Sequence, residues 1–273
     1  MGAAPLVTGL VGHRGGSGPA VVLLHGVASS WRDWAPVVPD LERDHEVIAL
    51  GFPGHAGQPP FAPGVHPDAD SLADAACAAM DDAGIGTATV AGSSLGGWIA
   101  LQLARRGRAD GVLALSPAGL FSNAEAAGLR RRLSFQHRVA RLVAPFAGLV
   151  ERSPLLAGLA MGGRRGSQRP AEVAHKLRAF GDCPVLPELL AGLEGMGPER
   201  LEGIRCPVVV GWGELDPLLP VCFADRFARA LPGARVVRLR GAGHLPTWDD
   251  PAAVAGLVRS VAGEAPIRHA GRR

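Results

Sequence analysis

The stretch TATVAGSSLGGWIA, residues 87–100, decides the fold. Its first five residues form a short apolar run that predicts a β-strand, and its last residues are typical of a helix. The segment GSSLGG between them, residues 92–97, then makes a sharp bend that carries a serine. Ser94 is that serine, because it has glycine two residues before and two residues after it, whereas Ser93 would have an alanine and a leucine there.

A serine on such a bend projects its hydroxyl above the edge of a sheet, but a G-x-S-x-G pattern alone is weak in a chain with 38 glycines. A serine nucleophile also needs a histidine to take its proton and a carboxylate to orient that histidine. Asp216 follows the apolar run 206–212, and His244 follows the run 234–239. Glu214 is the alternative acid, two residues from Asp216.

Each of these residues also has a purely structural interpretation. Ser94 would cap the following helix, Asp216 would be a turn residue before a proline, and His244 would lie in a surface loop. Two features together favour the catalytic interpretation. All three residues directly follow predicted strands, and they occur along the chain in the order serine, acid, histidine.

An acyl-transfer transition state also needs donors for a developing oxyanion. The backbone N–H of Leu95 is one candidate, since it directly follows the serine at a helix N-terminus. We expect the second donor to be the backbone N–H of Val27, after the strand that ends in a His25-Gly26 pair. His25 is expected to shape this loop through backbone hydrogen bonds rather than to transfer protons.

These motifs resemble those of the α/β-hydrolase superfamily: HG at 25–26, GSSLGG at 92–97, GELD at 213–216 and GH at 243–244. The resemblance spans Pro19 to Val261. It implies a mostly parallel sheet flanked by helices, a Ser-acid-His triad at the carboxyl ends of strands, no metal, and hydrolysis. One segment departs from the pattern: relatives commonly read D-x-P-G-x-G-x-S where this chain reads GFPGHAGQ, residues 51–58, so the aspartate that usually braces this loop is missing.

Short apolar runs alternate with helical patterns along the chain, which predicts an α/β fold with a mostly parallel sheet covered on both faces. We expect strands at Ala20–Leu24, Val47–Leu50, Thr87–Ala91, Gly111–Leu115, Val208–Trp212 and Ala234–Leu239. The connection 119–203 is too long for a loop and has its own amphipathic pattern from Ala124 to Phe146. The predicted organisation is a hydrolase core at 1–119 and 204–262, a helical cap at 120–203, and a disordered tail at 263–273.

The predicted cap contains apolar residues that we expect to form its core or to line an acyl pocket: Leu133, Phe135, Val139, Leu142, Phe146 and Leu149. It also contains two groups of arginines, at 130–132 and 164–165. A solvated helix face explains these arginines, and contact with an anionic substrate group is the alternative.

Composition narrows the function further. The net charge is +3, but the arginines are dispersed and there is no tyrosine, so we expect no nucleic-acid partner. Four scattered cysteines are expected to be buried, inert thiols, and the histidines form no ligand pair, so we expect neither metal nor cofactor. No apolar run is long enough to span a bilayer and no export signal is present, so a cytoplasmic enzyme with a small-molecule substrate and no membrane partner is expected. The oligomeric state stays open.

The sequence therefore predicts a serine hydrolase that cleaves a carboxylic ester, or a thioester or lactone, through an acyl-enzyme on Ser94. Two alternatives remain. One is a carbon-carbon bond hydrolase of the meta-cleavage-product type, although those relatives usually place Asn where this chain has Ser93. The other is a ligand-binding protein that keeps the fold without turnover.

Overall fold

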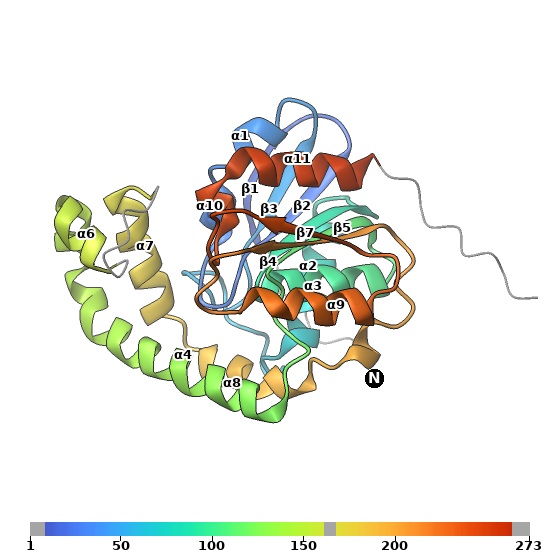
Figure 1. The fold of residues 1–273 in the computed structure, drawn as a ribbon. Coiled ribbons are helices and arrows are strands. Elements are labelled where there is room, and N and C mark those ends of the chain that lie inside the picture. The colour runs from blue at the N-terminus through green and yellow to red at the C-terminus, as the bar shows by residue number, and fades with distance from the viewer. Residues whose placement is uncertain (1–8, 161–167, 264–273) are drawn as a thin grey trace, which may run out of the picture.

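The computed structural model describes residues 9–160 and 168–263, and its centre is a seven-stranded sheet (Figure 1). The strand order is β1-β3-β2-β4-β5-β6-β7, and all neighbours are parallel except β1 and β3. The strands are β1 Val11–Gly16, β2 Ala20–Leu24, β3 Glu46–Leu50, β4 Ala88–Ser93, β5 Ala109–Leu115, β6 Val208–Gly213 and β7 Arg235–Leu239. The predicted α/β fold with a mostly parallel sheet is confirmed.

The six predicted strands are present, with ends that differ from the prediction by at most two residues, and the antiparallel edge strand β1 was not predicted. Its sequence, VGHRGG, has no apolar run, and half of its residues are glycine. It forms because Glu46–Leu50 offers a free edge for pairing. A strand that depends on its partner in this way leaves little trace in its own sequence.

Helices cover both faces of the sheet, as the alternation of apolar residues along β2 requires. Val22 and Leu24 belong to one buried cluster, whereas Val21 and Leu23 belong to the other. The first cluster includes residues of α2 Ala69–Asp82, α3 Leu95–Arg105 and α9 Ala224–Ala230. The second includes residues of η1 Trp31–Trp34, α1 Val38–Leu41 and α11 Pro251–Ala262, which is preceded by α10 Pro246–Asp249.

The described chain between β5 and β6 is helical and projects to one side of the sheet (Figure 1). We call Asn123–Leu201 the helical insertion. It contains α4 Asn123–Val143, η2 Ala144–Phe146, α5 Ala147–Arg152, α6 Pro154–Ala160, α7 Pro170–Gly181, α8 Leu186–Ala191, η3 Gly192–Gly195 and η4 Pro198–Leu201. One further short helix, η5 Val221–Phe223, precedes α9. The division into a catalytic core and a cap stays a prediction.

The prediction for the apolar residues of the insertion is wrong for all but one of them. Leu133 is buried, because it lies on the side of α4 that packs against α7 and α8. The other five lie on the opposite side and are exposed: Phe135, Val139, Leu142, Phe146 and Leu149. An apolar stripe on each side of a helix cannot be assigned to a core from periodicity alone.

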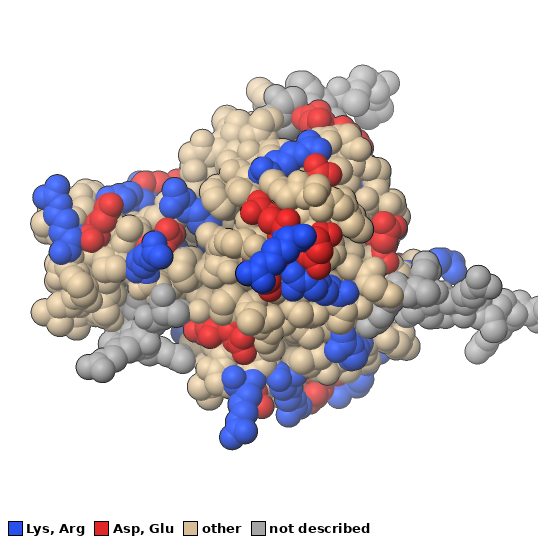
Figure 2. Space-filling view, turned by 90° about the horizontal axis from the view of Figure 1, so that it is seen from above, with Lys and Arg blue, Asp and Glu red and all other residues tan. Residues whose placement is uncertain are grey.

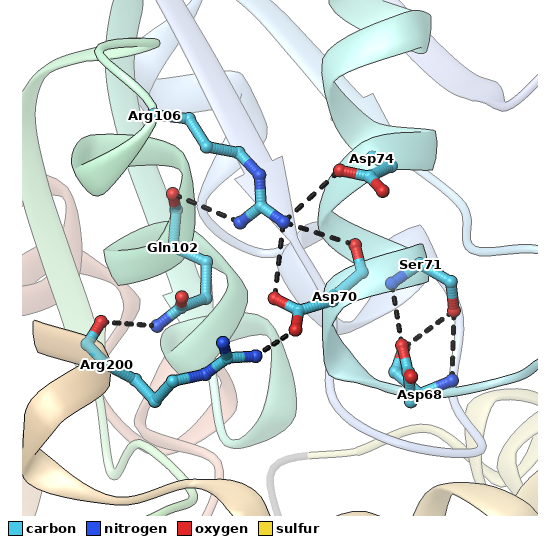
Figure 3. Close-up of polar contacts among 7 residues, drawn as sticks. All are labelled: Asp68, Asp70, Ser71, Asp74, Gln102, Arg106 and Arg200. Carbon is cyan, nitrogen blue, oxygen red and sulfur yellow. Dashed lines mark hydrogen bonds and ion pairs between the residues drawn. The ribbon is translucent and has the colours of Figure 1, made fainter. Parts of the chain in front are cut away.

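A polar cluster fastens the end of the insertion to the core helices (Figure 3). Arg106, just after α3, reaches Asp70 and Asp74 on α2 at 3.3 and 3.2 Å. Arg200 in η4 pairs with the same Asp70, and its carbonyl accepts a hydrogen bond from buried Gln102. The return of the chain into β6 is thereby held against α2 and α3.

The start of the insertion is fastened by a second ion pair. Glu125, in the first turn of α4, receives two hydrogen bonds of 2.7 Å from Arg226 of α9. It also accepts a hydrogen bond from the backbone of Ser122, which completes a capping box. Arg226 and Ser122 together lower the pKa of Glu125 to about 2.

The four cysteines are free, but they are not all buried as expected. Burial raises the pKa of Cys183 to about 12 and that of Cys206 to about 11. Cys77 is half-buried and Cys222 is exposed. Arg164, Arg165 and the tail from residue 264 onward lie outside the described residues. Within the described ranges, no helix combines the length and apolarity that a membrane span requires.

We predict that Glu125→Gln lowers the free energy of unfolding by about 1 kcal/mol near neutral pH. The folded carboxyl has the lower pKa, so its stabilisation is present above the unfolded pKa and is lost as the pH falls toward about 2. Urea denaturation across this pH range should show the two proteins converging in acid. A difference that stays constant with pH would contradict this assignment.

Candidate active site

Ser94 occupies the bend between β4 and α3 in a backbone conformation that disfavours side chains, with φ 55° and ψ −119°. Its N–H donates to the carbonyl of Leu115 at 2.8 Å. The two glycines that flank it are sterically required: a Cβ on Gly92 would lie 2.0 Å from the oxygen of Gly96, and one on Gly96 would lie 2.4 Å from the oxygen of His25. The strained bend is therefore held between neighbouring backbones.

Asp216 and His244 meet at the ends of β6 and β7. The Oδ2 atom of Asp216 lies 2.7 Å from Nδ1 of His244, and its Oδ1 atom accepts the amides of Leu218 and Leu219 at 2.8 and 2.9 Å. The two loops can approach because a Cβ on Gly213 would lie 2.0 Å from the oxygen of Gly243. With Nδ1 engaged, Nε2 is the ring nitrogen left to accept a proton.

The environment of Asp216 keeps it ionised. Burial alone would raise the pKa of this carboxyl, but the hydrogen bond from His244 and those from the two amides lower it below its usual value. Glu214, the alternative acid, is exposed, and no described residue forms a hydrogen bond with its side chain. The geometry therefore joins His244 to Asp216 and not to Glu214.

Val27 and Leu95, the candidate oxyanion donors, both lie beside Ser94. Among the described residues, neither backbone N–H has a hydrogen-bond acceptor. Leu95 is the first residue of α3, where the amides of the first turn and the helix dipole favour negative charge. Both amides are thus free to bind an oxygen that carries developing charge.

His25 lies below this loop and outside the cavity. It is completely buried, its Nδ1 lies 2.7 Å from the carbonyl oxygen of Gly26, and its ring packs against Phe52 and His55 at centroid distances of 4.8 and 5.4 Å. Burial lowers the pKa of His25, and it lowers that of His55 to about 3. Both rings are neutral packing groups near neutral pH, consistent with a loop-shaping role for His25.

The segment 51–58 is braced without the aspartate that similar sequences carry. A Cβ on Gly51 would lie 2.6 Å from the side chain of Gln58, which fills that space. The backbone N–H of Gln58 donates to the carbonyl of His55 at 2.8 Å, and the backbone N–H of Gly54 donates to the carbonyl of Pro59 at 2.8 Å. Backbone hydrogen bonds and one glutamine therefore hold this loop.

Ser94 and His244 line one cavity of about 500 Å³ between the core and the insertion. No hydrogen bond joins the two side chains among the described residues. The insertion contributes Leu133, Gln136, Val173, Lys176, Leu177 and Phe180 to this cavity. A second, smaller recess of about 30 Å³ also borders Ser94, and the rest of its lining is apolar. Arg130, Arg131 and Arg132 do not line the larger cavity.

Two charged residues of this cavity, Lys176 and Asp33, were not predicted from the sequence. Lys176 Nζ lies 3.2 Å from Oδ1 of Asp33, which is 2% exposed, and 4.9 Å from the centre of the Trp248 ring. Two neighbouring contacts also join α7 to this part of the core: His175 with Ser30 at 2.8 Å and Glu172 with Arg32 at 3.4 Å. Composition alone could have drawn attention to Lys176, because it is the single lysine among 28 basic residues.

A family model described as the alpha/beta hydrolase family matches residues 21–257. The chain belongs to this family. Within the described residues, no group of three or more His, Cys, Asp or Glu side chains is placed to hold a metal ion.

Two relatives of this hydrolase illustrate the range of the family. Epoxide hydrolase EphH of Mycobacterium tuberculosis is 30% identical over 197 residues, which is 69% of this chain and 92% of that protein. A pimeloyl-(acyl-carrier protein) methyl ester esterase of Aromatoleum aromaticum is 29% identical over 265 residues, or 89% and 98% of the two chains. A thermophilic esterase from Thermogutta terrifontis shares the fold, with a TM-score of 0.70, 22% identity and coverage of 91% and 90%.

We predict that Lys176→Met lowers the free energy of unfolding by about 3 kcal/mol, because it leaves the Asp33 carboxylate buried without a cation. The double variant Asp33→Asn/Lys176→Met should recover most of this loss, since it removes both charges. Urea denaturation of the native protein, of Lys176→Met and of the double variant gives the three free energies of unfolding to compare.

Arg32→Met is the matched control, because Arg32 is the exposed partner in the neighbouring ion pair with Glu172. It should cost at most about 1 kcal/mol. The single variant Asp33→Asn completes the set. If the loss of unfolding free energy in the double variant equals the sum of the losses in Asp33→Asn and Lys176→Met, the two charges do not interact.

Proposed function

We propose that this hydrolase cleaves a carboxylic ester through an acyl-enzyme on Ser94. The observation that carries the proposal is the shared cavity: a serine on a strained strand-to-helix bend and a histidine held by a buried carboxylate line the same space. These are the groups that nucleophilic acyl transfer requires, and they follow one another along the chain in the order serine, acid, histidine.

In the proposed first half-reaction, Ser94 Oγ attacks the ester carbonyl while Nε2 of His244 accepts the hydroxyl proton. The carbonyl oxygen becomes an oxyanion and is stabilised by the amides of Val27 and Leu95. Collapse of this intermediate breaks the bond to the alcohol, which leaves with the proton from His244. The Asp216 carboxylate stabilises the transient imidazolium and fixes its orientation.

In the second half-reaction, water attacks the acyl-enzyme and gives its proton to His244. The same two amides stabilise the second oxyanion, and Ser94 regains its proton when the carboxylic acid leaves. We propose that the helical insertion acts as a cap here. Its side chains line the cavity with apolar surface, which limits access of bulk water to the reacting atoms.

The two cavities suggest how an ester is held. The smaller recess, at about 30 Å³, is far smaller than the other cavity, and its lining apart from Ser94 is apolar, so it suits a small apolar group. The larger cavity, at about 500 Å³, has room for a medium-sized group that includes polar atoms. The proposed substrate class is therefore an ester with a short acyl chain and a larger alcohol. Thioesters and lactones undergo the same chemistry.

The nucleophile argues against epoxide opening, although one relative is named an epoxide hydrolase. Opening through an alkyl-enzyme ester needs a carboxylate at the bend, and this chain has Ser94 there. Carbon-carbon bond hydrolysis uses the same three groups, so a ring-fission diketone belongs in the substrate screen. A non-catalytic protein would bind esters without turnover.

We predict that Ser94→Ala reduces kcat/KM for p-nitrophenyl acetate by at least about 10⁴-fold while leaving the fold intact. Asp216→Asn should reduce it by about 10³- to 10⁴-fold, because an amide favours the wrong tautomer of His244. Glu214→Gln is the matched control and should stay within about twofold of the native enzyme. A larger loss in Glu214→Gln than in Asp216→Asn would contradict the acid assignment.

A second prediction concerns chain length. The p-nitrophenyl group is too large for the small recess, so the acyl chain of these substrates should enter it, and kcat/KM should fall steeply beyond short chains. Leu190→Ala, which enlarges the recess, should shift the preference to longer chains. Leu186→Ala is the control, since Leu186 is buried in the same helix but does not line the recess. An unchanged preference in Leu190→Ala would remove the acyl chain from this recess.

A further inference from the structure

The helical insertion carries an apolar stripe that faces away from the rest of the molecule. Its residues follow the spacing 4-3-4-3 from α4 through η2 into α5, which places them on one side of this helical run: Phe135, Val139, Leu142, Phe146 and Leu149. We call these five residues the outer stripe. Phe135, Leu142 and Phe146 are 67%, 75% and 63% exposed. Large apolar side chains exposed in a row are unusual on a protein surface.

The opposite side of the same run already has its packing partner. Leu133, Ala140 and Ala144 are buried there, where α4 contacts α7 and α8. In Figure 1, α4 lies at the outer edge of the molecule, with the described helices and the sheet on one side of it only. The outer stripe is therefore not needed to hold the insertion together.

Positive charge lies along one edge of the outer stripe. Residues 123–160 contain six arginines and two glutamates, a net charge of +4, whereas the whole chain has a net charge of +3. Arg131, Arg138, Arg141 and Arg152 are exposed, and within the described ranges none has an ion-pair partner. From above, the projecting end of the insertion shows blue and red side chains interspersed on a largely tan surface (Figure 2).

A second copy of the chain is the competing occupant, since a 4-3-4-3 stripe also suits helix pairing. The flanking positions decide against it. Arg131, Arg138 and Arg152 follow one edge of the stripe at seven- and fourteen-residue spacing, and the other edge has Gln136, Val143 and Val150. No acidic residue is available on either edge to pair with these arginines across an interface, and antiparallel helices would bring like charges together.

We propose that the outer stripe is a docking surface for an anionic phospholipid bilayer. Phenylalanine and leucine side chains would enter the boundary between headgroups and acyl chains, and the flanking arginines would contact the phosphates. The helix would lie in the plane of the membrane surface and would not span it. The expectation of no membrane partner was based on the lack of an apolar run long enough to span a bilayer. Contact with the membrane surface needs no such run. The proposal is independent of the proposed ester hydrolysis.

The test is co-sedimentation with vesicles, using the Ser94→Ala protein so that hydrolysis plays no part. We expect binding to vesicles of phosphatidylglycerol and phosphatidylcholine in equal amounts, weaker binding at high salt, and much weaker binding to phosphatidylcholine alone. Phe135→Ser/Leu142→Ser should weaken binding by about tenfold or more, because both side chains are lost from the contact. Turnover of a water-soluble ester by the same double variant, made with Ser94 intact, should be unchanged, which verifies the fold.

A matched pair of charge variants tests the role of the arginines. Arg131→Glu/Arg138→Glu should weaken binding to the anionic vesicles by about tenfold or more. Arg205→Glu/Arg229→Glu changes the net charge equally at two exposed positions outside the insertion and should have little effect.

Three results would overturn the proposal. The first is native-like vesicle binding by Phe135→Ser/Leu142→Ser. The second is equal binding to vesicles with and without phosphatidylglycerol. The third is a lack of vesicle binding together with a native dimer, seen by sedimentation velocity, that Phe135→Ser/Leu142→Ser converts to monomer, because the stripe would then join two copies of the chain.

Discussion

Close contact between backbones at the carboxyl ends of the strands is the constraint on which the site depends. Gly92 and Gly96 allow the bend at Ser94 to pack against its own helix and against the end of β2. Gly213 allows the loop of Asp216 to pack against the loop of His244. A methyl group at any of these positions would separate elements that must touch, so three glycines determine how closely the segments that carry Ser94, Asp216 and His244 can approach one another.

Electrostatics then divides the cavity into two regions. Near the reacting atoms, Asp216 is held as a carboxylate by His244 and two amides, and the candidate oxyanion donors have no other acceptor. Farther away, Lys176 and Asp33 neutralise each other between the insertion and the core. The second pair adds no net charge to the cavity, which is consistent with a neutral ester as substrate. It also links the position of α7 to the shape of the cavity.

The sequence predicted the parts of the molecule whose structure is determined locally. The six parallel strands are short apolar runs, and the bend at Ser94 is marked by glycines that the local geometry requires. The roles of Ser94, Asp216 and His244 stay predictions, although the structure joins two of these residues directly and brings the third to the same cavity. Strand β1 and the outward orientation of Phe135 and Leu142 were not predictable, because each depends on what packs against the element and not on its own pattern.

Acyl transfer through Ser94 is tested most directly by a crystal structure of the enzyme after reaction with a p-nitrophenyl alkylphosphonate, a stable analogue of the acyl-transfer transition state. We expect phosphorus bonded to Ser94 Oγ, with the phosphonyl oxygen about 3 Å from the backbone nitrogens of Val27 and Leu95. Phosphorus on a different side chain, or a phosphonyl oxygen directed away from both amides, would contradict it.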